Sequence, residues 1–336
     1  MNQVNSRIVY LDYLRILACL LVIFTHAAMP VQESDGIYLS IISLIGSPSS
    51  ELFLALSGAV LLPIKTDFSS FYKRRFSKLL PPLIIWSVLY TLISFFGGEI
   101  GYSNVIEQLI KMPFTPIVGV YWFMYVMIGL YLFAPIISPW IKKKKKKQLE
   151  VFLLIWGISL LMPYLNIFIP NIYNANGNYY WTLCYFSGFL GYWILGCYLL
   201  KHPIKIGFNF RWLLCLVGTL IYLFVLLILK LNNFEMGPYF DNLQIGSAFL
   251  VAIIFTIVQN LPLKQSNIVS NIANCSFGIY LIHIIIVRNF VWTFFESCNI
   301  NPILETSIIT LISFVISLLI VKILSKLPFS KYIVGI

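Results

Sequence analysis

Residues 10–27, YLDYLRILACLLVIFTHA, form an apolar stretch long enough to cross a bilayer, and they decide the class of the fold. The stretch holds Arg15 and His26, with ten residues between them. Because an α-helix turns about 100° per residue, both side chains are expected on one face, about 16 Å apart along the axis. Ionisable groups at membrane depth are costly and usually line a substrate path. The pair therefore predicts a functional face on a membrane helix.

The composition of the whole chain is also that of a polytopic membrane protein. Of 336 residues, 60% are apolar and 10% are charged, whereas a soluble domain carries roughly 25% charged residues. Apolar runs predict an all-α bundle of about ten transmembrane helices in a single domain, 1–336, without a separate soluble domain. The predicted spans are 9–30, 44–64, 79–98, 119–141, 149–167, 181–200, 211–231, 243–261, 272–291 and 303–324. Segments 37–64 and 99–118 are interrupted by Gly and Pro, and each could hold a short interfacial or re-entrant helix.

The basic residues set the expected orientation. Twenty of the 23 Lys and Arg fall on one side of the predicted spans, and Lys111, Lys230 and Arg288 fall on the other. The positive-inside rule then places both termini in the cytoplasm. The net charge of +11 is explained by this topology together with contact to anionic membrane lipids, so nucleic-acid binding is not needed. The lysine run 142–147 is interpreted as a topology anchor, with lipid or phosphate contact as the alternative.

Other sequence signals exclude several classes of site. The first apolar stretch carries charges early and no clear cleavage site, so it is expected to be retained as a span rather than removed as a signal peptide. The six cysteines form no C-x-x-C motif and the three histidines form no zinc pattern, so no metal is expected. No glycine-rich phosphate loop is present in the sequence.

Three residues, Arg15, His26 and Glu51, are candidates for catalysis. The imidazole of His26 is suited to take a proton from a hydroxyl nucleophile. Glu51, at the start of the second span, could orient His26, or it could be an interfacial charge whose stem lies along the apolar surface. Asp12 is expected to pair with Arg15, three positions away. The Ser57–Gly58 step is interpreted as a site of close helix approach rather than as a nucleophile.

A basic cluster follows the second span in FYKRRFSKLLPPLIIW, residues 71–86. Arg75 and Lys78 are three apart and share a helical face with which they could bind phosphates, and Arg74 lies beside them. Positive-inside anchoring alone would also explain these charges. The next helix is expected to begin at the Pro81–Pro82 pair.

Aromatic residues mark two further candidate positions. Trp122, Phe123 and Tyr125 open the fourth span, where an interfacial aromatic belt and an acceptor-binding platform are both possible. Tyr280 and His283 share a face of the ninth span. For His283, a hydrogen bond between helices is the alternative to a role in substrate binding.

The order of these motifs resembles membrane-bound acyltransferase family 3, which modifies bacterial surface glycans. The motifs are YLDYLRILACLLVIFTHA, ELFLALSG, FYKRRFSKLLPPLIIWSVLY, YWFMYVMIGLYLFAPII and FGIYLIH, and together they extend over nearly the whole chain. The family's pattern of a basic residue, ten residues and a histidine falls on Arg15 and His26. Its two arginines spaced three apart fall on Arg75 and position 78, where this chain has Lys78 instead.

The resemblance implies an acyltransferase in the bacterial cytoplasmic (inner) membrane. Its donor would be cytoplasmic acetyl-CoA or another acyl-CoA, with the phosphates held by Arg74, Arg75 and Lys78. Its acceptor would be a hydroxyl of a surface glycan or lipid-linked sugar, presented near His26, Trp122, Tyr125, Tyr280 and His283. The chain ends soon after its last span, so it is expected to be the form without an extracytoplasmic domain, acting directly or with a separate partner.

Two alternatives remain open at this stage. A transporter or exporter of a small substrate or acyl group would use a buried Arg–His–Glu path equally well, although the two halves show no convincing internal repeat. Transfer of a succinyl rather than an acetyl group would use the same chemistry.

Overall fold

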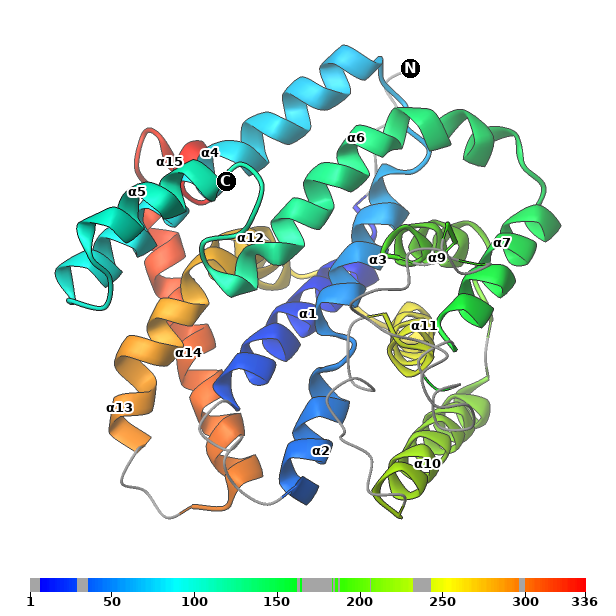
Figure 1. The fold of residues 1–336 in the computed structure, drawn as a ribbon. Helices are drawn as coiled ribbons and strands as arrows, with labels where there is room; N and C mark the ends of the chain where they lie inside the picture. Colours follow the sequence, from blue (N-terminus) through cyan, green and yellow to red (C-terminus); the bar gives the residue numbers. More distant parts are fainter. Residues whose placement is uncertain are drawn as a thin grey trace. The chain divides into compact units, whose positions relative to one another are not determined.

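The structure of the chain is a computed structural model, and the part of the chain that it describes is all-helical (Figure 1). The described residues are 7–28, 36–161, 164, 183, 185–186, 188–205, 207–231, 243–295 and 300–336, and they contain no strand. The all-α prediction is therefore confirmed for these residues. The contacts divide the chain into two compact units, 1–62 with 141–273 and 63–140 with 274–336. The single domain expected from the sequence stays a prediction.

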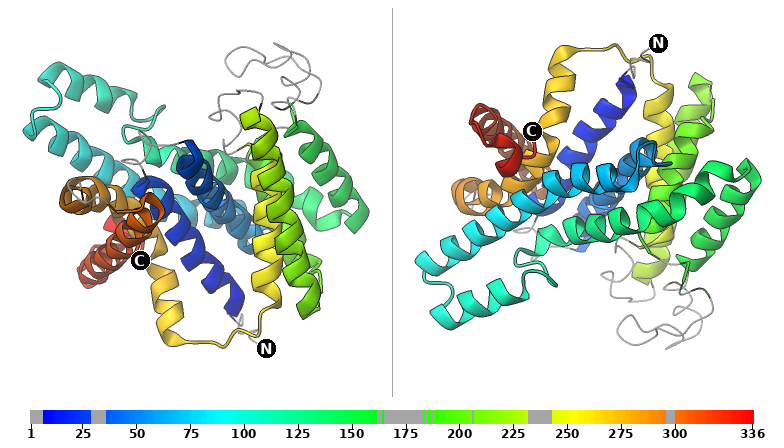
Figure 2. Two further views of the ribbon diagram at one scale, coloured as in Figure 1. Left: turned by 90° about the horizontal axis from the view of Figure 1, so that it is seen from below. Right: turned by 90° about the horizontal axis from the view of Figure 1, so that it is seen from above.

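Unit 1 contains the first predicted span. Its helices are α1 (Val9–Ala27), α2 (Gly36–Gly46), α3 (Ser49–Leu61), α7 (Lys146–Ser159), α9 (Leu190–Lys201), α10 (Phe208–Leu231), α11 (Ile245–Asn260) and the first residues of α12 (Asn267–Ile286). The helix α3 packs against α1 and α9, and α10 lies beside α11 (Figure 2). Apolar side chains such as Leu14, Ile23, Leu52 and Trp193 are fully buried and form the core of this unit.

Unit 2 contains the long helices α4, α6 and α14 and the end of the chain. It contains α4 (Phe68–Phe96), α5 (Tyr102–Lys111), η2 (Gly119–Tyr121), most of α6 (Trp122–Lys143), the rest of α12, the π-helix η4 (Val287–Val291), α13 (Trp292–Phe295), α14 (Pro302–Leu324) and α15 (Ser330–Ile333). The helices α5 and α15 both pack on α4.

Six helical segments of the described part are long and apolar enough to cross a membrane. They are Val9–Ala27, Leu44–Leu61, Phe68–Phe96, Gly119–Lys143, Asn267–Phe295 and Pro302–Leu324. The chain is thus a multi-pass membrane protein. A helix occupies each of the ten predicted positions, but α7, α9 and α11 have only 14, 12 and 16 residues. Parts of the predicted spans 149–167 and 181–200 lie outside the described residues, so the count of ten and the cytoplasmic termini stay predictions.

Both interrupted segments contain a short helix, as expected. In the first, α2 ends at Gly46 and a two-residue turn leads into α3. In the second, the ten-residue α5 buries no side chain and carries an ion pair at 2.5 Å between Lys111 Nζ and Glu107 Oε1. Helices of this length are too short to cross a bilayer.

Candidate functional site

Arg15 and His26 lie on one uninterrupted helix, α1. Their separation of eleven residues therefore places them on one face, and both side chains are only partly buried. Leu14, Ala18 and Ile23 of the same helix are fully buried. The chemical roles of the two residues stay predictions.

The first turns of α1 hold a charge network around Asp12. Arg7 donates to both carboxylate oxygens, at 2.5 Å from Nε and 3.0 Å from Nη2, and Ser270 Oγ donates at 3.1 Å. Arg15 Nη1 lies 3.7 Å from Asp12 Oδ1, so the expected pair is confirmed. However, Arg7 is the closer partner. Arg7 Nη2 also donates to Ser270 O at 3.0 Å, so the network ties the start of the chain to α12.

The opposite end of α1 lies against the turn that precedes Glu51. Thr25 Oγ1, next to His26, is 3.5 Å from Gly46 O, and a Cβ on Gly46 would lie 2.3 Å from that hydroxyl oxygen. Glu51 is in the first turn of α3, is fully buried, and accepts a hydrogen bond from Ser50 Oγ at 3.1 Å. The packing of α1, α2 and α3 thus brings the segments that carry His26 and Glu51 to the same corner of unit 1.

Two glycines fix the position of α3. A Cβ on Gly58 would lie 1.9 Å from Trp193 O of α9, and a Cβ on Gly196 would lie 1.8 Å from Ala55 O of α3. Both distances are far below van der Waals contact, so only glycine permits this approach of the two backbones. The interpretation of Ser57–Gly58 as a close-approach site is therefore confirmed, and its partner is α9.

The basic cluster lies within α4, not in a loop before it. The expected helix start at Pro81 and Pro82 is wrong, because α4 begins at Phe68 and contains both prolines. Asp67 caps this helix, since its side chain accepts a hydrogen bond from Ser70 N at 2.8 Å. The capping side chain and the thirteen helical residues 68–80 set the helix start well before the prolines.

The basic side chains of α4 have different surroundings. Arg74 and Lys78 are exposed, whereas Arg75 is half-buried with its guanidinium 5.9 Å from the centre of the Phe71 ring. Because α4 is helical here, Arg75 and Lys78 share a face as expected. Such a face can bind phosphate groups, and this role stays a prediction.

Tyrosine hydroxyls hold the aromatic positions of unit 2 to backbone carbonyls. Tyr121 donates to Leu281 O at 2.8 Å and Tyr280 donates to Val120 O, so η2 and α12 are joined twice. Tyr125 donates to Met112 O and, at 3.1 Å, to Thr115 O. These bonds show that the hydroxyls hold the fold together, and binding of an acceptor by Tyr125 and Tyr280 stays a prediction.

Trp122 and His283 complete the aromatic group. Trp122 is partly buried and packs edge-on against Phe123 with ring centres 6.3 Å apart, while Phe123 packs against Tyr280 at 5.6 Å. His283 is fully buried, and its Nδ1 is 2.6 Å from Tyr280 O of the same helix. Since a carbonyl only accepts, Nδ1 carries the hydrogen and Nε2 is the acceptor nitrogen. This bond lies within α12, and the alternative of a hydrogen bond between helices stays a prediction.

The sequence reasoning missed two sets of residues. In the sequence, Arg7 bears only on the positive-inside rule. Its spacing of five residues from Asp12 nevertheless indicates that the two side chains can form an ion pair at the start of the helix. Tyr90 and Tyr121 stand at the edges of the motifs FYKRRFSKLLPPLIIWSVLY and YWFMYVMIGLYLFAPII, and nothing in the sequence indicates that their rings pack edge-on 5.7 Å apart.

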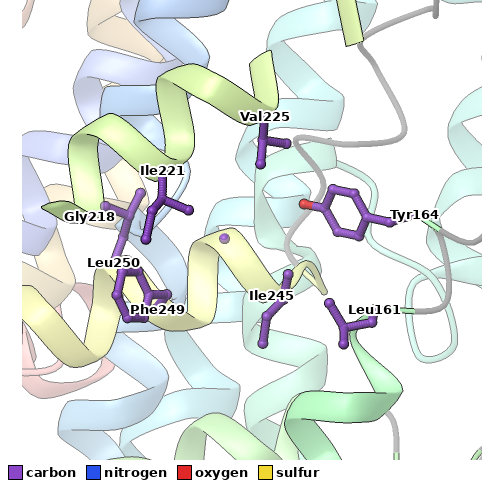
Figure 3. A pocket seen from close by; sticks show the side chains of 9 residues that line it. Leu161, Tyr164, Gly218, Ile221, Val225, Ile245, Phe249 and Leu250 are labelled. Atoms are coloured by element: carbon purple, nitrogen blue, oxygen red, sulfur yellow. The ribbon is translucent and has the colours of Figure 1, made fainter. Parts of the chain in front are cut away.

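Unit 1 also contains an apolar pocket of about 430 Å³ between the end of α7, α10 and the start of α11 (Figure 3). Its lining residues are Leu161, Tyr164, Gly218, Ile221, Val225, Ile245, Gly246, Phe249 and Leu250. The Tyr164 hydroxyl is the only polar side-chain atom among them, and a water molecule needs two to four polar partners. The pocket therefore suits a hydrocarbon chain.

The pocket and His26 both lie away from a junction that joins the end of α11 to the start of α1. At this junction, Gln259 Nε2 donates to Tyr10 Oη at 3.1 Å. Phe255 packs on Tyr10 with ring centres 6.0 Å apart. The pocket residues Ile245–Leu250 precede Gln259 and His26 follows Tyr10, so both lie roughly 15–25 Å from this junction, at 1.5 Å per residue.

No group of three metal-ligating side chains occurs within the described ranges. The cysteines Cys19, Cys197, Cys215 and Cys275 are free thiols, and Cys184 and Cys298 lie outside the described residues.

Comparison with known families agrees with this architecture. A family model for an acyltransferase domain matches residues 8–322, which is nearly the whole chain. No curated protein matches. No solved structure matches either. With a multi-pass helical fold and a family match that includes α1, α3, α4 and α12, the chain belongs to acyltransferase family 3.

Proposed function

We propose that this protein is an O-acyltransferase of the bacterial cytoplasmic membrane that moves an acyl group, in the simplest case acetyl, from cytoplasmic acyl-CoA to a sugar hydroxyl. The acceptor is a cell-surface polysaccharide or a lipid-linked sugar. Membership of an acyltransferase family supports the reaction class. The observation that carries the residue assignment is the shared face of Arg15 and His26 on α1, next to the corner that leads into the buried Glu51.

In this proposal His26 is the general base. Its imidazole accepts the proton of the acceptor hydroxyl while that oxygen attacks the thioester carbonyl. A new C–O ester bond forms, the C–S bond breaks, and the departing thiolate takes up the proton, so the products are an acylated sugar and free CoA. Glu51 stabilises the transient imidazolium in the way that the acid of a catalytic triad does. Arg15 is always charged and therefore positions the donor rather than transferring a proton.

The basic face of α4 supplies the donor end of this proposal. Arg74, Arg75 and Lys78 bind phosphates of the acyl-CoA by charge and hydrogen bonding. Lys78 offers a point charge where the family pattern has the planar fork of arginine, so replacement of Lys78 by arginine should preserve donor binding.

The apolar pocket favours a lipid-linked acceptor over a free polysaccharide. A pocket between α10 and α11 that suits a hydrocarbon chain would hold the lipid tail of such an acceptor in unit 1, which also carries His26. The test compares the rate of transfer to the same sugar in two forms, linked to a prenyl lipid in the vesicle membrane and free in solution. Faster transfer to the free sugar would contradict the lipid-linked assignment.

The test of the proposed function is His26→Ala in proteoliposomes supplied with labelled acetyl-CoA. We expect acyl incorporation into glycan to fall by about 10²–10⁴-fold, the range for loss of a general base. Thr25→Val is a control for packing at the neighbouring position. Membrane insertion and thermal unfolding should be those of the wild type. Undiminished transfer by a well-folded His26→Ala protein would refute the assignment, and mass spectrometry of the product identifies the transferred group as acetyl or succinyl.

A further inference from the structure

The end of the chain is packed on the basic helix of unit 2. Trp86 Nε1 of α4 donates to Ile333 O of α15 at 2.8 Å, and Val334 is fully buried. Ser330 Oγ donates to Ile336 O at 3.1 Å, which closes the last residues into a compact turn. Figure 1 shows α15 and the C-terminus beside α4. The C-terminal segment is therefore part of the fold at this place.

The prolines of α4 create the position that the C-terminal segment occupies. Pro82 has no backbone N–H, so it cannot donate to the carbonyl of Lys78, four residues earlier. Gly335 comes up against this carbonyl, because a Cβ on Gly335 would lie 3.7 Å from Lys78 O. The φ angle of Gly335 is +74°, a conformation that favours glycine. The proline in α4 and the glycine near the chain end therefore both favour this close approach to Lys78.

This arrangement adds a fourth cation to the basic face. Lys331 is exposed, lies two residues before Ile333, and has its Nζ 5.5 Å from the centre of the Tyr332 ring. Lys331 lies in α15, which packs on α4, and is four residues before Gly335, whose position meets the Lys78 carbonyl, so the chain end brings its positive charge to the part of α4 that carries the basic cluster. Like charges gathered in this way destabilise the empty site and favour a bound polyanion.

We propose that Lys331 binds the phosphate groups of the donor together with Arg74, Arg75 and Lys78. The C-terminal helix α15 then forms part of the site for a phosphate-bearing thioester of the coenzyme A class. This inference rests on the proposed function. It assigns a donor-binding role to a segment that carries none of the motifs found in the sequence.

The matched pair for the test is Lys331→Ala and Lys326→Ala. Both lysines are exposed and both lie in the C-terminal segment, but only Lys331 belongs to α15, the helix that packs on α4. Purified proteins in phosphatidylcholine vesicles are assayed for binding of coenzyme A and for the KM and kcat of acetyl transfer. We expect Lys331→Ala to weaken coenzyme A binding and raise KM by about 3- to 10-fold, with kcat little changed, since one charged hydrogen bond to phosphate is lost. Lys326→Ala should behave as the wild type, and Lys331→Arg should retain binding.

A second donor separates phosphate binding from a structural role. Acetyl-pantetheine carries the thioester without any phosphate ester, so its KM should be the same in Lys331→Ala and wild type. An equal rise in KM for both donors would overturn the inference, because it would show a general disturbance of α15. An unchanged KM for both would overturn it as well.

Vesicles containing phosphatidylglycerol test the other source of phosphate. If Lys331→Ala changes only the response to this anionic lipid and leaves coenzyme A binding intact, Lys331 contacts a lipid headgroup and the inference is wrong. Failure of the proposed function looks different. A wild-type protein that binds coenzyme A without transferring the acyl group would refute the reaction while the binding comparison still decides the role of Lys331, and a wild type that does not bind coenzyme A would refute both.

Discussion

Two buried carboxylates of unit 1 stand at opposite ends of α1. Asp12 lies among two guanidinium groups and a serine hydroxyl, contributed by Arg7, Arg15 and Ser270. Glu51 accepts a hydrogen bond from its neighbour Ser50 and follows the turn that meets Thr25, next to His26. Their exposed fractions are almost equal, 3% and 0%.

The difference shows that burial alone does not mark a catalytic acid. The hydrogen bonds around Asp12 join the start of the chain to α12, which is what a structural carboxylate does. Glu51 lies on the helix that packs at the histidine end of α1, where a carboxylate can stabilise an imidazolium. The two residues therefore form a matched pair for the same chemical change, carboxylate to carboxamide.

The largest effect is expected for Glu51→Gln. The amide keeps the size of the side chain but removes the negative charge that the proposed function assigns to the stabilisation of His26, so transfer should fall by about 10²–10³-fold, within the range seen when a preorganised electrostatic partner is lost. Steady-state transfer by the reconstituted protein measures this. Activity within a fewfold of the wild type would assign Glu51 to the structure, as Asp12 is, and would remove the contrast.

Gly58→Ala is expected to act on the same corner by moving α3. The added Cβ would lie 1.9 Å from Trp193 O, a backbone atom that no side-chain rotation can displace. We expect a loss of about 2–3 kcal/mol of stability together with slower transfer. Gly129→Ala is the control, since a Cβ there meets nothing within 4 Å. Thermal unfolding in detergent compares the two, and equal midpoints would show that the α3–α9 contact yields easily.

Asp12→Asn should reduce stability more than activity. It leaves Arg7 and Arg15 without their shared anion, but both guanidinium groups are about one-third exposed, so water screens much of the cost. A loss of about 1–2 kcal/mol is expected, with transfer per folded molecule nearly that of the wild type. A selective loss of transfer in a protein of normal stability would place Asp12 in the chemistry and reverse the comparison.

The smallest effect is expected for an exposed carboxylate, Asp67, which caps α4. Its hydrogen bond from Ser70 N lowers the pKa of the carboxyl below 3.8. The cap therefore stabilises the fold above pH 3.8 and is lost as the pH falls through the lowered pKa. Asp67→Ala should melt slightly earlier than the wild type at pH 7, and the two should converge in strong acid. A gap that widened on acidification would contradict this sign.

The sequence predicted the helical class and the positions of the helices, because long apolar runs have few other solutions in a membrane. The Arg15–His26 spacing and the Gly58 step also followed from helical periodicity alone. The start of α4 did not follow from the sequence. A proline pair favours a helix start, but the helix begins after its capping residue, Asp67. Local rules compete at such a place, and the sequence does not show which one wins.

Contacts between distant segments were beyond the sequence. Nothing in Lys331 or Trp86 indicates that α15 packs on α4, and nothing in Arg7 indicates Ser270 as a partner. Such pairs depend on how the helices are arranged, and periodicity describes one helix at a time. The shared face of Arg15 and His26 could be predicted because both residues lie on one helix, whereas the packing of α15 on α4 required the structure.

The glycine contact between α3 and α9 also bears on how the protein is made. Gly58 leaves the ribosome long before Gly196, and at about 5–20 residues per second the delay is on the order of ten seconds. Throughout this time the helix that carries Glu51 has no partner for its closest backbone approach. The corner proposed to be catalytic is therefore expected to form late in biogenesis, so a chain truncated before α9 should insert its first helices without gaining activity.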